Sequence, residues 1–192
     1  MDFILDMAVR FWPMTIFIIL VIIGSIVNLF DRKIDNRVNF KYVDYPHMKP
    51  IRIATKGKGF WGAIILWFFG TRHWEVVKDF NYSLDGKQYI IPKGFKFDGA
   101  SVPKFLAQFL SPVGLLLIGG LIHDYGYKYE TLLLKNKKTI GVKTQQWMDE
   151  TFRDINIEVN GFYLLNYLAY WALRVGGFVA WNKHRKVNAK IT

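Results

Sequence analysis

Two short polar motifs hold most of the side chains in this chain that could do chemistry. FDGASVP contains Asp98 and Ser101, and HDYGY contains His123, Asp124 and Tyr127. An almost uncharged apolar run separates the two motifs. A charged or titratable side chain in such surroundings is costly to desolvate unless it is paired or bound. We therefore expect these side chains to contact one another or a ligand.

A metal site is the first chemistry that they suggest. Asp149, in a predicted helix over residues 144–156, could join Asp98, His123 and Asp124 if the segments pack together. One imidazole and three carboxylates suit Mg²⁺, Mn²⁺ or a Zn²⁺ ion. A water bound to such a metal would be a nucleophile near neutral pH, so this set indicates a metal-dependent hydrolase.

The same residues also allow an enzyme without a metal. His123 could act as a general acid or base, oriented by Asp124 or Asp98. Tyr127 follows His123 by four residues and lies on the same helical face. Ser101 is a weaker candidate nucleophile, because DGASVP lacks the strained elbow of G-x-S-x-G hydrolases.

A purely structural role would leave the same residues in the sequence. Asp98 could cap the turn before the next helix, and the HDYGY side chains could form a satisfied buried network. Asp149 could pair with Lys128 or Arg153. The sequence leaves the structural, binding and catalytic interpretations open.

The stretch IIPKGFKFDGASVP, the later LIHDYGY, the helix with Asp149 and Phe152, and the final GGFVAW occur in a distinctive order. In these motifs the chain resembles domain-of-unknown-function family 1353, found mostly in bacteriophages and prophages. The resemblance runs from about Trp74 to Trp181. It implies a fold and a phage origin, and it brings no established activity.

Residues 1–30 are expected to form a membrane anchor. Residues 11–30, FWPMTIFIILVIIGSIVNLF, carry no charge and have the length that an α-helix needs to cross a bilayer core. A cleaved signal peptide fits less well, because the leading residues are acidic and no small-x-small cleavage site precedes Asp31.

Basic residues suggest the orientation and the partner. Arg32, Lys33, Arg37 and Lys41 follow the predicted span, whereas Arg10 and the α-amine precede it, which predicts that the C-terminal domain lies in the cytoplasm of a bacterial host. The net charge of +11 would draw the protein to anionic lipid headgroups. Nucleic acid is not expected, because no recognisable binding motif accompanies the bases. A host or phage protein partner remains an alternative.

The remaining chain predicts an α+β fold: a transmembrane helix, then a small antiparallel sheet packed with three or four helices. Residues 31–59 are expected to form a tether with short extended pieces, 60–182 a compact domain, and 183–192 a basic tail. Asp-Gly at 85–86 between two extended runs predicts a hairpin. The absence of cysteine excludes disulfides and thiolate metal sites.

Two apolar segments could either pack in the core or meet the membrane. FWGAIILWFFG, at 60–70, is too short to span a bilayer and would be a core element or an interfacial segment. Residues 161–181 have membrane length, but Arg174 near the middle would be expensive in lipid, so a core helix is expected. The sequence thus predicts a membrane-anchored phage-type binding protein, with the metal-dependent hydrolase as the alternative.

Overall fold

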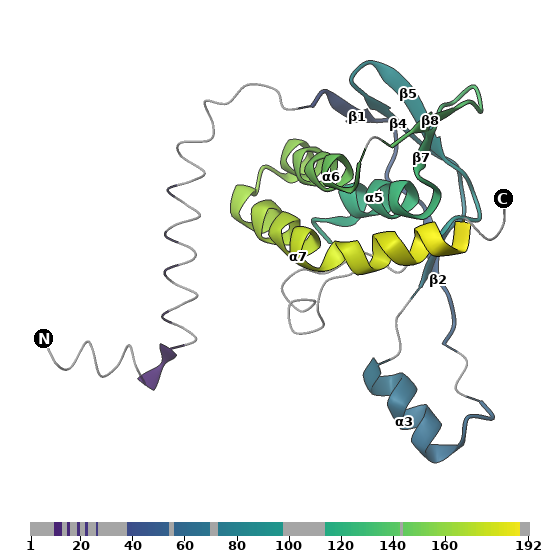
Figure 1. The fold of residues 1–192 in the computed structure, drawn as a ribbon, viewed down its shortest axis with the longest axis vertical. Helices are drawn as coiled ribbons and strands as arrows, with labels where there is room; N and C mark the ends of the chain where they lie inside the picture. The colour runs from purple at the N-terminus through teal and green to yellow at the C-terminus, as the bar shows by residue number, and fades with distance from the viewer. Residues whose placement is uncertain are drawn as a thin grey trace, which may run out of the picture.

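The computed structural model describes residues 10–12, 15, 19, 22, 26, 38–53, 56–69, 73–97, 114–142 and 144–188. In this part of the chain, small antiparallel sheets lie beside three mutually packed helices, and a further helix, α3, projects away from them (Figure 1). The predicted α+β class is therefore confirmed, as are its small antiparallel sheets.

The first sheet has the order β1-β4-β5, from β1 (Phe40–Tyr42), β4 (Phe80–Leu84) and β5 (Lys87–Ile91). Its strands are antiparallel, and β4 joins β5 through Asp85 and Gly86. Both turn residues have positive φ, 48° and 77°. Such a turn matches the twist of the flanking strands, which is why Asp-Gly predicted this hairpin correctly.

The second sheet has the order β2-β3-β6, from β2 (Met48–Pro50), β3 (Trp74–Val76) and β6 (Lys96–Phe97). Its pairings are also antiparallel. Strands β1 and β2 both fall in the range 31–59 that the sequence assigns to a tether. That range therefore contributes one strand to each of these two sheets, because backbone donors and acceptors in an extended piece are satisfied best by a neighbouring strand.

A third, two-stranded sheet joins β7 (Thr131–Leu133) to β8 (Thr139–Gly141). Strand β8 lies within the basic segment KNKKTIGVK at 135–143. A bridge between Tyr89 and Leu134 connects this hairpin to β5.

Helix α5 (Leu117–Tyr129) supplies the HDYGY motif, and α6 (Gln145–Asn160) supplies Asp149. The side chain of Thr144 accepts a hydrogen bond from the Trp147 amide at 3.0 Å and caps the start of α6. Gly161, with φ of 65°, ends the helix in the left-handed conformation that glycine adopts readily. Three apolar residues at a spacing of four and three along α6 are all buried: Met148, Phe152 and Ile155.

Helix α7 (Tyr163–Asn188) continues into the range 183–192, which the sequence assigns to a basic tail. Its last turns bind the C-terminal end of α5. Arg185 Nη1 lies 2.5 Å from Glu130 Oε1, and Asn188 Nδ2 donates to the Lys128 carbonyl at 2.9 Å. The Lys128 carbonyl is one of the groups that a helix end leaves without an intrahelical partner, so these contacts join the basic turns of α7 to the end of α5.

Helix α3 (Gly59–Phe69) corresponds to the apolar segment predicted at 60–70. Phe60 and Trp61 are each 73% exposed and Ile65 is 58% exposed. None of its described side chains belongs to the buried core, and the helix projects from the body of the fold in Figure 1. The interpretation of this segment as a core element is therefore not supported for the side chains that the structure describes.

The predicted membrane helix over 11–30 lies mostly outside the described residues, of which it includes only isolated positions. Across the part of the chain that is described, no helix combines the length and the apolar character needed to cross a bilayer.

Candidate functional site

Asp149 lies at the centre of a buried polar cluster, which we call the Asp149 network: Asp149, His123, Tyr127 and Arg174. The Asp149 side chain is fully buried. Its Oδ1 accepts hydrogen bonds from His123 Nε2 at 2.8 Å and from the Tyr127 hydroxyl at 2.5 Å. Its Oδ2 accepts from Arg174 Nη1 at 2.7 Å. Three donors thus satisfy one carboxylate that burial would otherwise strongly destabilise.

Glycines on α5 let α6 come close enough to form this network. A Cβ at Gly126 would overlap the Met148 thioether, and a Cβ at Gly119 would overlap the Asn156 side chain. The Gly119 amide donates to Asn156 Oδ1 at 3.2 Å. His123 and Tyr127 are one helical turn apart on α5, so both side chains reach the Asp149 carboxylate on the closely packed α6.

Helix α7 closes the network from the other side. A Cβ at Gly177 would lie 2.7 Å from the Tyr127 hydroxyl, so only glycine allows this approach. The Trp181 ring packs edge-on against Tyr127, with centroids 5.0 Å apart. This packing brings Arg174, one turn before Gly177, onto Asp149.

Contacts within the network determine its protonation. Burial alone would lower the pKa of His123, but the carboxylates of Asp124 and Asp149 outweigh it and raise this pKa above the ordinary 6.5. Burial alone would raise the pKa of Asp149, but its hydrogen-bond donors outweigh it and lower this pKa below the ordinary 3.8. The network therefore favours an imidazolium held by a carboxylate.

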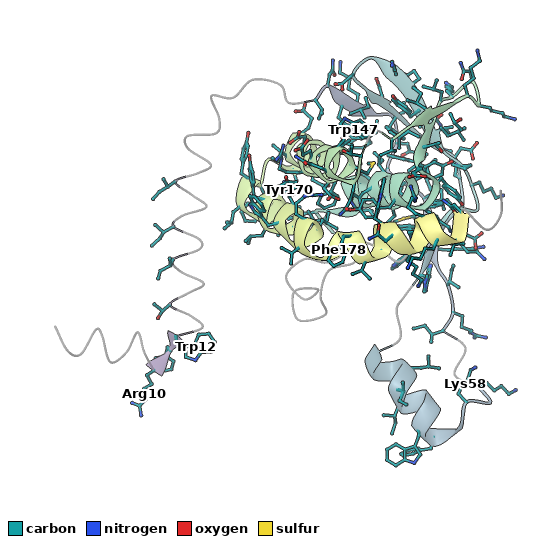
Figure 2. All side chains as sticks on the ribbon, viewed as in Figure 1. Arg10, Trp12, Lys58, Trp147, Tyr170 and Phe178 are labelled. Atoms are coloured by element: carbon teal, nitrogen blue, oxygen red, sulfur yellow. The ribbon has the colours of Figure 1, made fainter. Side chains whose placement is uncertain are left out.

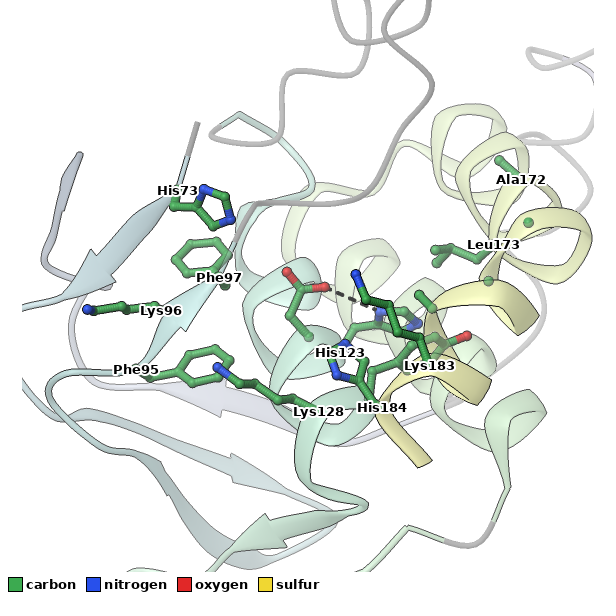
Figure 3. A pocket seen from close by; sticks show the side chains of 15 residues that line it. His73, Phe95, Lys96, Phe97, His123, Lys128, Ala172, Leu173, Lys183 and His184 are labelled. Carbon is green, nitrogen blue, oxygen red and sulfur yellow. Dashed lines mark ion pairs between the residues drawn. The ribbon is translucent and has the colours of Figure 1, made fainter. Parts of the chain in front are cut away.

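His123 also faces a pocket of about 440 Å³ between α5, α7 and the ends of β3 and β6 (Figure 3). His123 Nδ1 lies 3.7 Å from Asp124 Oδ1, the ion pair drawn dashed in Figure 3. The titratable side chains that line the pocket among the described residues are His73, Lys96, His123, Asp124, Tyr127, Lys128, Lys183 and His184. A ligand in this pocket would therefore lie beside titratable side chains from α5, α7 and the segments next to β3 and β6.

The structure brings together three members of the predicted metal set, His123, Asp124 and Asp149, around one imidazole. Asp98 and Ser101 lie outside the described residues. Among the residues that are described, no group of three or more His, Asp or Glu side chains is arranged to hold a metal ion. Both Asp149 oxygens are already occupied by protein donors. The metal site therefore stays a prediction, and it depends on Asp98.

The arrangement could support proton transfer at one wall of the pocket. The His123 ring lies between the carboxylates of Asp149 and Asp124, and Asp124 is partly exposed, with 16% of its side chain accessible. Tyr127 was a candidate catalytic residue, but its hydroxyl donates to Asp149 and its side chain is buried. This contact favours a positioning role for Tyr127.

Sequence reasoning did not find Arg174, the third donor to Asp149. It expected Lys128 or Arg153 as the partner, whereas Arg153 pairs with Asp154 at 2.7 Å. The available signal was a single Arg in an otherwise apolar segment. From the sequence alone, this Arg indicated only that residues 161–181 do not span a bilayer. An Arg in such a segment also requires a buried acidic partner, and Asp149 is that partner.

The comparisons with known proteins give a family and no activity. Residues 74–173 match the model of a family described as "Protein of unknown function (DUF1353)". That range covers β3 to the middle of α7 and includes His123 and Asp149. No match was found among curated proteins or among solved structures.

Proposed function

The chain belongs to the family described as protein of unknown function (DUF1353), and on that premise we propose that it is a membrane-anchored, phage-type accessory protein. It acts by binding at the inner membrane of a bacterial host. Its membrane helix is residues 11–30, its C-terminal domain lies in the cytoplasm, and its first partner is anionic lipid. A host or phage protein is a further partner of the same membrane-bound domain.

The outer face of α7 carries the proposal. Five large apolar side chains there are between 43% and 76% exposed: Leu168, Trp171, Val175, Phe178 and Val179. Their spacing of three and four residues places them along one side of the helix, on which Figure 2 labels Phe178. A continuous exposed apolar face of this kind marks an interaction surface, since isolated exposed residues would be scattered.

Helix α3 supports a lipid partner for that surface. It exposes Phe60, Trp61 and Ile65, and the exposed bases Lys56 and Lys58 directly precede it; Lys58 is labelled in Figure 2. Aromatic and aliphatic side chains beside lysines are typical of helices that lie in the headgroup region of a bilayer. The 20-residue apolar segment and the net charge of +11 favour the same partner.

Fractionation and site-specific labelling test the anchor and the orientation. The chain has no cysteine, so Lys138→Cys gives the full chain a single thiol on the exposed β7–β8 turn. We expect the protein to stay in the membrane pellet after an alkaline wash. We also expect an impermeant maleimide to label position 138 only after spheroplasts are lysed. Release by the alkaline wash would refute the anchor, and labelling of intact spheroplasts would refute the cytoplasmic orientation.

A metal-dependent hydrolase is the second candidate, favoured by the position of His123 and Asp124 in the pocket wall. In that case Asp98 completes the ligand set. Titration of the full chain in detergent with Mg²⁺, Mn²⁺ and Zn²⁺ by calorimetry would give saturable binding that Asp98→Asn and Asp124→Asn each abolish without loss of folding. Binding that survives both substitutions, or no binding of the three ions, would exclude this candidate.

A further inference from the structure

The pocket beside His123 is lined by positively charged side chains that have no part in the proposed membrane attachment. We propose that it binds a phosphate-bearing anion of small size, a phosphomonoester in particular. This inference goes beyond membrane binding and does not require it, because the pocket residues are distinct from the exposed apolar side chains of α3 and α7. It also needs no metal and no catalytic step.

Cations outnumber anions around the pocket. Lys96, Lys128 and Lys183 line it, while Asp124 is the only acidic side chain among the described lining residues. Asp124 already faces the His123 imidazole at 3.7 Å. Neither Lys128 nor Lys183 forms an ion pair with any residue that the structure describes. An anion is the ligand that would balance this excess of positive charge.

Two of the lysines are placed to meet such an anion. In Figure 3, Lys183 on α7 extends past the His184 ring toward the middle of the view, Lys128 on α5 extends toward Phe95, and Lys96 points away from both. The Lys128 ammonium lies over the Phe95 ring, 5.5 Å from its centroid, which restrains the side chain near the pocket. Ammonium groups bind phosphate as compact charges with several donors, so two of them and an imidazole suit a phosphomonoester dianion.

Small residues on the inner face of α7 create the space. Ala172, Gly176 and Ala180 line the pocket, and a Cβ at Gly176 would meet no atom within 4 Å. A volume of about 440 Å³ lies in the range of ordinary ligand pockets. The helix therefore leaves room for a phosphate and its attached organic group.

The phosphate could come from two sources. Lys183 lies one helical turn beyond Val179, which belongs to the exposed apolar face. If that face meets a bilayer, a lipid phosphomonoester such as phosphatidic acid would be close to Lys183. A free phosphomonoester in solution offers the same chemistry, so the experiment must separate the two sources.

Calorimetric titration of the full chain tests the site. The chain is held in phosphatidylcholine nanodiscs, and glycerol 3-phosphate is the probe. We expect saturable binding that Lys183→Ala weakens by about tenfold or more, since a charge-assisted contact is lost. Lys186→Ala is the matched control, because it removes an equal charge from the same helix outside the pocket, and it should change the affinity by less than about twofold.

Two results would overturn the proposal: no saturable binding of glycerol 3-phosphate in these nanodiscs, or equal losses for Lys183→Ala and Lys186→Ala. Thermal unfolding of each variant checks that the fold is retained. Nanodiscs that also contain phosphatidic acid then identify the source. Loss of glycerol 3-phosphate binding there assigns the pocket to the lipid headgroup, and unchanged binding assigns it to a free phosphomonoester.

Discussion

The two sides of α7 differ in what they contact: one packs against α5 and α6, and the other carries exposed apolar side chains. On its inner side, Arg174 donates a charged hydrogen bond to the fully buried Asp149, and Gly177 lies against the Tyr127 hydroxyl. On its outer side, Trp171 and Val175 remain 59% and 76% exposed. On the inner side a buried carboxylate is matched by three donors, and the outer side exposes apolar groups that the described fold does not cover.

This difference separates what holds the domain together from what it offers to a partner. A saturated carboxylate has little capacity left for a ligand, so the Asp149 network is best explained as a structural element that also positions His123. An exposed apolar face gains free energy when it leaves water, so it is the part of α7 that favours binding. The predictions below test each side in turn.

The largest effect is expected from Asp149→Ala on the inner side. It would leave the charges of His123 and Arg174 without their buried partner, so we expect the free energy of unfolding to fall by about 3–5 kcal/mol. Glu150→Gln, at the next position on α6, should change stability by less than about 0.5 kcal/mol, because Glu150 is only partly buried. Chemical denaturation measures both, and a loss under about 1 kcal/mol for Asp149→Ala would contradict the structural role.

The adjacent glycines of α7 provide a second, paired test. Gly177→Ala would place a methyl group against the Tyr127 hydroxyl, which Asp149 holds in position, and should cost about 1–3 kcal/mol. Gly176→Ala meets no neighbour and should stabilise the helix by up to about 1 kcal/mol. Equal effects in thermal unfolding would show that α7 does not pack on α5 in this way.

The Asp149 network should also make stability depend on pH. Because folding raises the pKa of His123, its contribution is fully present below pH 6.5 and is lost as the pH rises through the raised value. Because folding lowers the pKa of Asp149, its contribution is present above pH 3.8 and is lost as the pH falls through the lowered value. The difference in melting temperature between wild type and His123→Gln should therefore shrink as the pH rises above 6.5, and a difference that grows with pH there would refute the assignment.

The smallest effect on stability is expected on the outer side. Trp171→Ser removes an exposed side chain and should change the free energy of unfolding by no more than about 0.5 kcal/mol. A loss of several kcal/mol in denaturant titrations would mean that this face is already covered within the folded chain.

Local signals in the sequence predicted much of this fold. Asp-Gly at 85–86 gave the β4–β5 hairpin, and the apolar spacing gave α6, because both depend on neighbouring residues. The pairing of Asp149 with Arg174 could not be predicted this way, since it depends on how α6 packs on α7. The ordered basic turns of α7 were missed for a similar reason, because Glu130 and the end of α5 hold them.

The candidate site was predicted in part. The spacing of His123 and Tyr127 indicated a shared face of α5, and both do donate to Asp149. The excess of lysine around the pocket was not predicted, because Lys128 and Lys183 are far apart in the chain. They line the same pocket only because α5 packs against α7.

Electron paramagnetic resonance on a spin label at Val175→Cys tests most directly whether the outer face of α7 meets lipid. The full chain, which has no other cysteine, is reconstituted into vesicles that contain anionic lipid, and a label at Lys138→Cys is the control. We predict that the label at 175 is relaxed by oxygen and protected from a water-soluble nickel chelate, while the label at 138 shows the reverse. Equal access of the chelate to both labels would contradict the account.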